Sequence, residues 1–194
     1  MTTAILFAGP SGAGKTSIIE NIIKINLDFE HIFIYMTRPL RKGEKDRATK
    51  TKTELEQMYE KGEILYLLQK HNVFFGPSTI SFQGILNRNK IPMIEMSIYD
   101  IDTFRNVHKD ILVVYVVPPS KEILGKRLLR DSRDNRYYSS LVEMDDYLSG
   151  KFDKIIDFRL VCDDGKIEES ARKVINHFNK LKQNPIPIQI KRCN

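Results

Sequence analysis

The sequence predicts an α/β protein built on a doubly wound, parallel five-stranded sheet with helices on both faces. Apolar runs typical of buried strands recur at residues 3–8, 31–36, 91–96, 111–117 and 154–161. Helical patterns lie between most of them, at residues 15–25, 98–107, 120–130, 138–148 and 166–181. Strands that alternate with helices form parallel sheets, because each helix carries the chain back to the starting edge of the sheet.

A glycine-rich loop joins the first strand to the first helix. Its residues are Gly9, Pro10, Ser11, Gly12, Ala13, Gly14, Lys15 and Thr16, a complete Walker A motif. The glycines let backbone N–H groups curl around a polyphosphate, Lys15 can reach its β- and γ-phosphates, and Thr16 can bind Mg²⁺. The sequence therefore predicts a P-loop NTPase fold that binds a nucleoside triphosphate, a class shared by kinases, GTPases, ATPases and motor proteins.

The alternation of strands and helices is interrupted between residues 37 and 90. A basic turn with a proline, a short helix, two β-like pieces and another short helix indicate a small α+β insert mounted on the core. We therefore expect a single domain with core segments 1–36, 91–126 and 150–181, an insert at 37–90, a lid at 127–149 and a tail at 182–194.

Composition limits the possible partners and the location. The chain has 194 residues and a net charge of +6, and no apolar run is long enough to cross a membrane. Cys162 and Cys193 lack the spacing of metal ligands, so we expect reduced thiols. No leader precedes the first strand, so we expect a cytoplasmic protein. We expect a monomer or a homodimer. The positive charge suits nucleic acid or a site for several phosphates; the clustering of the arginines favours phosphates, without nucleic acid or membrane as partner.

Two groups of arginines are candidates for contacts with transferring phosphates. Arg38 and Arg41 follow the second strand, at the sheet edge where the phosphate loop also lies. The other group spans the end of a helix and a segment without apolar anchors, which suits a mobile lid: Arg127, Arg130, Arg133 and Arg136. In isolation, both groups would be ordinary solvated charges.

Glu95 is a lone carboxylate at the end of an apolar strand. A buried acid needs a partner or a metal ion. Two roles are open: Glu95 either holds the hydration shell of Mg²⁺ together with Thr16, or pairs with a nearby basic side chain.

The chain resembles the guanylate kinase family over nearly its whole length. Similar segments are the phosphate loop, the turn from Thr37 to Glu44, the pieces Gly62 to Leu65 and Phe74 to Gly76, the run Val117 to Ser120 followed by Lys126-Arg127-Leu128, and Cys162-Asp163-Asp164. The resemblance implies ATP and Mg²⁺, an acceptor-binding insert and a lid. It also implies that Arg38 and Arg41 hold the acceptor's phosphate and that Lys15, Arg38, Arg130 and Arg133 are catalytic.

The acceptor site departs from the family pattern. The family's glutamate that reads the base falls at Tyr66, and its Tyr-Gly-Ser becomes Phe75-Gly76-Pro77. The family's Asp-x-Asp becomes Glu95-Met96-Ser97 in this chain. The family's Asp-Tyr pair is missing, because the polar segment that would carry it is shortened. The arginine of the family's second lid helix falls near Ser140. We expect Tyr66, Phe75 and Ser97 to line the acceptor site, with His71 close by in sequence. Because guanine's N–H donors call for a carboxylate, we expect GMP to be a weak acceptor or to be matched by another compound.

Three functions remain open at this point. The first is transfer of the γ-phosphate of ATP to GMP or another nucleoside monophosphate. The second is phosphorylation of a phosphosugar, as by the related ribose 1,5-bisphosphate phosphokinase. The third is a guanylate kinase-like module that binds nucleotide or phosphopeptide without turnover, which the intact phosphate loop disfavours.

Overall fold

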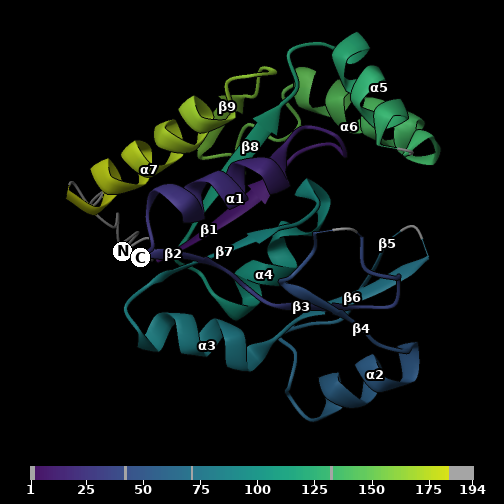
Figure 1. Cartoon of the computed structure of the whole chain (residues 1–194), viewed down its shortest axis with the longest axis vertical. Helices are drawn as coiled ribbons and strands as arrows, with labels where there is room; N and C mark the ends of the chain where they lie inside the picture. Colours follow the sequence, from purple (N-terminus) through teal and green to yellow (C-terminus); the bar gives the residue numbers. More distant parts are fainter. Residues whose placement is uncertain (1–2, 42, 71, 132, 184–194) are drawn as a thin grey trace, which may run out of the picture.

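The computed structural model describes residues 3–41, 43–70, 72–131 and 133–183. A parallel sheet with strand order β2-β7-β1-β8-β9 forms the core (Figure 1). Its strands are β1 (Ala4–Ala8), β2 (Phe29–His31), β7 (Ile91–Glu95), β8 (Ile111–Val117) and β9 (Phe158–Val161). In the register, Phe7 lies opposite both Glu95 and Val114, so the ends of the three central strands meet beside the phosphate loop. The predicted five-stranded α/β fold is confirmed.

Helices cover both faces of this sheet. On one face, α1 (Lys15–Ile25) and α7 (Ile167–Gln183) pack side by side, with Ile18, Ile22 and Val174 in the shared core (Figure 1). On the other face, α3 (Thr79–Asn87), the short helix η1 (Ile98–Asp100) and α4 (Ile101–Val107) bury apolar side chains such as Phe82 and Phe104.

A second sheet of order β4-β3-β6-β5 forms the insert, together with α2 (Lys52–Glu60). Its strands are β3 (Ile34–Met36), β4 (Arg47–Thr49), β5 (Leu68–Lys70) and β6 (Val73–Pro77). The single strand predicted at 31–36 is therefore wrong: the Ile32 N–H still bonds the Met93 carbonyl of the core, whereas Ile34 already pairs in the second sheet. The second sheet thus takes strand β3 from residues that we assigned to the core. The last core strand also begins later than predicted, at Phe158, because residues 151–155 form turns.

The segment predicted as a lid, 127–149, covers the end of α5 (Lys121–Arg130), the short helix η2 (Asp134–Arg136) and α6 (Tyr137–Leu148). Leu124, Leu128 and Met144 form the small core of these helices. Most of the predicted tail, with Cys193, and also His71 lie outside the described residues; residues 182 and 183 belong to α7.

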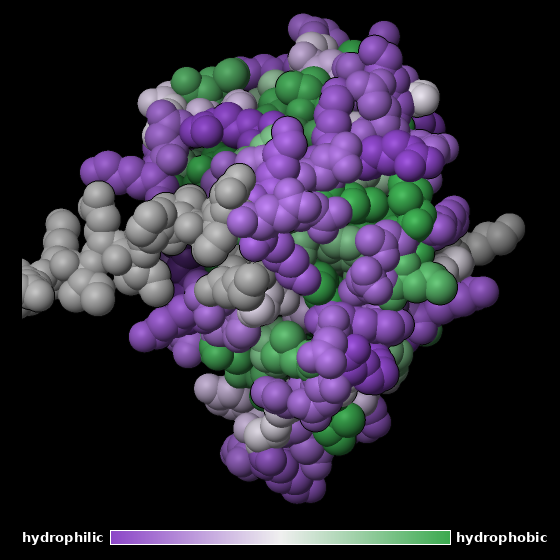
Figure 2. Space-filling model, turned by 90° about the vertical axis from the view of Figure 1, so that its left-hand side faces the viewer, coloured by the Kyte–Doolittle hydropathy of each residue, from purple (hydrophilic) through white to green (hydrophobic). Residues whose placement is uncertain are grey.

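Within the described residues, no helix is both long and apolar enough to span a bilayer. The face drawn in Figure 2 is mostly hydrophilic and carries its apolar side chains in several small groups.

Candidate active site

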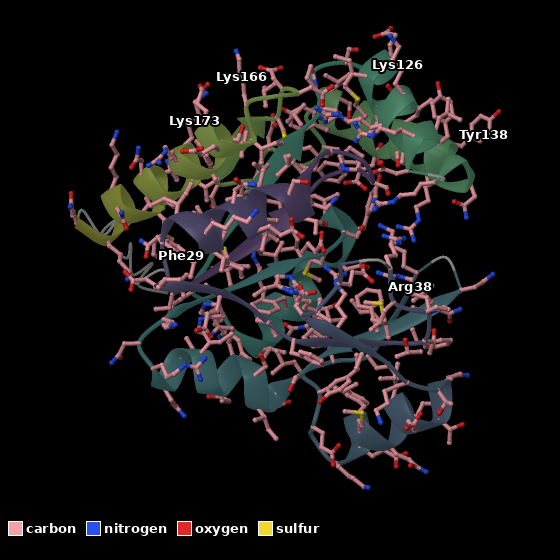
Figure 3. All side chains as sticks on the ribbon, in the orientation of Figure 1. Phe29, Arg38, Lys126, Tyr138, Lys166 and Lys173 are labelled. Atoms are coloured by element: carbon pink, nitrogen blue, oxygen red, sulfur yellow. The ribbon has the colours of Figure 1, made fainter. Side chains whose placement is uncertain are left out.

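A cavity of about 700 Å³ lies where the core, the insert and the lid meet. Arg38 extends from the insert toward it (Figure 3). Six of the eight predicted phosphate-loop residues line the cavity: Gly9, Ser11, Gly12, Gly14, Lys15 and Thr16. Pro10 and Ala13 contribute through the backbone, since the Ala13 N–H bonds the Pro10 carbonyl at 3.2 Å.

The phosphate loop has the backbone conformation that its glycines predict. Gly9 and Gly14 have φ angles of 135° and 102°. A Cβ atom on Gly9 would lie 2.4 Å from the Val116 carbonyl oxygen, so this loop packs against β8 with no room for a side chain. Gly14 is also the N-cap of α1, so the positive end of that helix points at the cavity.

Lys15 turns back onto its own loop. Its Nζ donates to the carbonyl oxygens of Gly9 at 2.7 Å and Pro10 at 2.9 Å. Burial lowers its pKa, although Glu143 and Glu95 act in the opposite direction. The half-buried ammonium group is therefore held beside the cavity, where we expect a triphosphate to lie.

The two predicted metal ligands are brought together. Thr16 Oγ1 donates to Glu95 Oε2 at 3.0 Å, across 79 residues of sequence. The other carboxylate oxygen, Oε1, accepts from Arg47 Nη2. Burial alone would raise the pKa of Glu95, but Arg47, His31 and Lys15 outweigh it and hold this pKa at about 2. Glu95 is therefore ionised. It pairs with a base, as one of its two predicted roles requires, and it lies beside Thr16, where its predicted metal role stays a prediction.

Sequence analysis missed Arg47, which lines the cavity from β4. It lies in the polar segment that we regarded only as shortened. The sequence offered one indication of its role: Arg47, Ala48 and Thr49 can form a short strand, and this strand pairs with β3. Only that pairing turns its side chain toward Glu95.

The predicted arginines of the insert and lid converge on one place. Arg38 binds Glu44 through two hydrogen bonds, of 2.6 and 2.8 Å, and the Arg41 N–H bonds the same carboxylate. Partial burial, and then the charges of Arg133, Arg38 and Arg136, lower the pKa of Arg41 to about 10. Like charges gathered in this way are typical of a site that awaits an anion.

The four lid arginines have different roles. Arg133 and Arg136 face the insert's arginines across the cavity, and Arg133 Nε is buried without a hydrogen-bond partner among the described residues. Arg130 also lines the cavity and pairs with Asp131. Arg127 also lines the cavity but is buried, and it donates to the Gly12 and Ala13 carbonyls of the phosphate loop at 3.4 Å and to the Cys162 carbonyl at 2.8 Å. In this structure it therefore supports the loop.

The structure brings two of the three predicted base-site residues to the cavity. Phe75 and Ser97 line the cavity, and Ser97 Oγ is buried without a partner among the described residues. The prediction for Tyr66 is wrong: its ring is 4% exposed, packs against Phe104 at 6.2 Å between centroids, and is absent from the described lining of the cavity. Tyr66 precedes β5 on the side covered by α4, so this apolar ring is drawn into the core.

A buried carboxylate from the lid was also missed. Glu143 on α6 lines the cavity, is 4% exposed, and has an Oε1 atom without a hydrogen-bond partner among the described residues. Burial raises its pKa, against the attraction of Lys15 and Lys70. No pattern in the sequence marks this residue, because it is one of several acids along an amphipathic helix.

A phosphate loop at the end of a parallel strand, with an arginine-rich insert and lid across one cavity, defines a P-loop kinase. The family model for guanylate kinase matches residues 1–181, and the chain belongs to this family of nucleoside monophosphate kinases.

Individual relatives agree with this assignment. The chain is 29% identical over 138 residues to a guanylate kinase of Bdellovibrio bacteriovorus, covering 70% of this chain and 74% of that one. It is 25% identical over 189 residues to one of Nitrosomonas europaea, covering 93% and 79%. Among solved structures, a guanylate kinase from Anaplasma phagocytophilum matches with a TM-score of 0.71 at 19% identity, covering 95% of this chain and 88% of that chain. At that identity the structural match supports the fold alone.

Proposed function

We propose that this protein transfers the γ-phosphate of ATP to GMP or a closely related nucleoside monophosphate, with Mg²⁺ as cofactor. One observation carries the proposal: a single cavity joins an intact phosphate loop to arginines that converge from the insert and the lid. Phosphoryl transfer between two nucleotides needs this arrangement, since positive charge must surround the transferring group.

The residues present fit a magnesium ion. Thr16 and Glu95 offer two oxygen ligands at the phosphate loop, and Mg²⁺ takes its other ligands from water and phosphate oxygens. Described residues form no cluster of three or more acidic, histidine or cysteine ligands, which agrees with a metal held mainly by the nucleotide. When bound, the ion neutralises charge on the β- and γ-phosphates.

Each side chain then has a defined task. Lys15 leaves its two carbonyl partners to bind the ATP phosphates, and Arg38 and Arg41 orient the acceptor's phosphate in line with them. Arg130 and Arg133 approach from the lid, stabilise the charge of the transition state and help to exclude water.

The residues that line the cavity next to Phe75 favour a nucleotide as the acceptor. Met36, Val73 and Phe75 provide apolar contact, and Glu143 and Asp100 provide carboxylates within the same cavity. These acids supply acceptors for the N–H donors of guanine, which Tyr66 does not.

A phosphosugar is the second candidate acceptor. Arg47 favours it, because it adds a cation to the cavity where a second phosphate could bind. We infer that the protein acts in the cytoplasm, as a monomer or a homodimer.

Steady-state kcat/KM values for GMP, AMP, UMP, CMP, dTMP and ribose 1,5-bisphosphate test the proposal. The sequence alone predicts that GMP is a weak acceptor or is matched by another compound, but Glu143 and Asp100 supply carboxylates in the cavity, so we expect GMP to be the best nucleotide acceptor. A preference for ribose 1,5-bisphosphate over GMP of about a hundredfold, equivalent to roughly 2.7 kcal/mol, would establish the phosphosugar function instead. Absence of turnover with every acceptor, although MgATP binds, would refute the kinase assignment.

A further inference from the structure

Arg47 lies between the two halves of the active site. Its side chain is only 9% exposed, and its Nη2 atom contacts Glu95, the expected metal ligand. Its Nε atom lies 3.3 Å from Asp46 and 3.8 Å from Glu44. The guanidinium group therefore connects the expected metal ligand Glu95 with Glu44, the carboxylate that binds Arg38 and the Arg41 N–H.

In this state, both oxygens of Glu95 are occupied. Oε1 accepts from Arg47, and Oε2 accepts from Thr16. The Arg47 guanidinium thus provides Glu95 with the positive partner that a buried carboxylate requires. A divalent cation brought to Glu95 would meet this positive charge, so the two cations compete for one carboxylate.

Arg38, the expected ligand of the acceptor's phosphate, shares a carboxylate with the same guanidinium. Glu44 Oε1 accepts from Arg38 Nη2 at 2.6 Å and lies 3.8 Å from Arg47 Nε, so the two arginines share one carboxylate oxygen. A phosphate that takes the place of Glu44 on Arg38 would attract Arg47 also. Arg47 moves only the end of its side chain to change partners, because its backbone is fixed in β4 beside Ile34.

We infer that Arg47 is a further ligand of the acceptor's phosphate, and that its transfer from Glu95 to that phosphate couples acceptor binding to Mg²⁺ binding. This inference rests on the proposed function. Without acceptor, Arg47 opposes the metal at Glu95; with acceptor, it leaves Glu95 free. By reciprocity, Mg²⁺-bound nucleotide also tightens binding of the acceptor by the same factor.

Equilibrium calorimetry with the non-hydrolysable analogue β,γ-imido-ATP tests this coupling. The Mg²⁺ dependence of analogue binding is measured with no acceptor, with saturating GMP, and with guanosine as the phosphate-free match. We expect GMP, but not guanosine, to increase the Mg²⁺ affinity of the wild-type complex by about tenfold, within the usual range of coupling between sites.

Arg47→Gln should remove this dependence. In the variant, Mg²⁺ binding without acceptor should be tighter than in the wild type, GMP should bind more weakly, and the coupling should vanish. Arg47→Lys should retain part of the coupling, since it keeps the charge but loses the planar fork. Arg88→Gln breaks an arginine–glutamate pair outside the cavity and serves as the control that should leave all three constants unchanged.

Two results would overturn the inference. One is unchanged coupling in Arg47→Gln. The other is loss of Mg²⁺ binding in Arg47→Gln while Arg88→Gln binds normally, which would mean that Arg47 only holds Glu95 in place. Failure of the proposed function is distinguishable, because GMP would then bind without being phosphorylated; in that case ribose 1,5-bisphosphate replaces GMP in the same titration.

Discussion

Truncation of Arg127 should destabilise the protein far more than neutralisation of its acidic partner. Its guanidinium donates to the Cys162 carbonyl at 2.8 Å and to Asp164 Oδ1 at 2.9 and 3.1 Å. The two side chains of the Arg127–Asp164 ion pair differ in their exposure to water. The Asp164 side chain is 68% exposed, whereas that of Arg127 is 6% exposed.

This difference in exposure determines how much stability each substitution costs. In Arg127→Ala, the buried Cys162 carbonyl loses its charged donor, which costs about 1–3 kcal/mol. Loss of the two buried CH₂ groups beyond Cβ adds roughly 1.6 kcal/mol, at about 0.8 kcal/mol per CH₂. Asp164 regains water and adds little, so the expected loss in free energy of unfolding is about 2.5–4.5 kcal/mol. Asp164→Asn should cost under about 1 kcal/mol, as for an exposed ion pair.

Thermal and urea denaturation measure both changes. For a domain of this size, each kcal/mol lowers Tm by about 2–4 °C, so Arg127→Ala should melt roughly 5–18 °C lower than the wild type. Arg172→Ala, which removes an exposed i,i+4 partner of Glu168 on α7, is the matched control and should change Tm little. Equal losses in Arg127→Ala and Asp164→Asn would refute the reasoning, because the ion pair would then outweigh the carbonyl contact.

Four further changes have defined outcomes. Lys15→Ala should lower kcat by about a hundredfold or more while ATP affinity, measured by calorimetry, falls much less; full activity would exclude its catalytic role. Arg38→Ala should raise the acceptor's KM and lower kcat, and Arg38→Lys should not fully restore them; equal turnover of guanosine and GMP would contradict this phosphate contact. Gly9→Ala should destabilise the loop by more than about 1 kcal/mol, because its Cβ would lie 2.4 Å from a carbonyl oxygen at a φ of 135°; an unchanged Tm would show that the loop relaxes freely. Burial raises the pKa of Glu143, so its contribution to stability is present below the unfolded value of 4.5 and is lost as pH rises through the folded pKa; Glu143→Gln should therefore raise Tm more at pH 8 than at pH 5, and the reverse order would contradict the shift.

The sequence by itself determined the phosphate loop and the parallel sheet. Both follow from short-range patterns: the loop's glycines adopt positive φ angles between an apolar strand and a helix, and buried strands are apolar along their whole length. Arg38 and Arg41 line the cavity, but not for the reason predicted, because the turn that carries them follows β3 of the second sheet and not a strand of the core. Family membership followed from the same segments and is confirmed.

Only the tertiary structure decided which side chains face the cavity at its acceptor end. Tyr66 and Phe75 both lie in or next to strands of the insert, yet Tyr66 enters the core and Phe75 the cavity. Successive side chains of a strand point to opposite faces, so their fate depends on which face α4 and the core cover.

Arg47 and Glu143 also could not be assigned to the site from the sequence. Arg47 meets Glu95 across 48 residues, and Glu143 comes to Lys15 from the lid. Their neighbours in sequence carry no trace of these contacts, because a charge acquires its partner from the packing of distant segments. The donor half of this site is a property of one contiguous loop, whereas the acceptor half exists only where three separate segments meet.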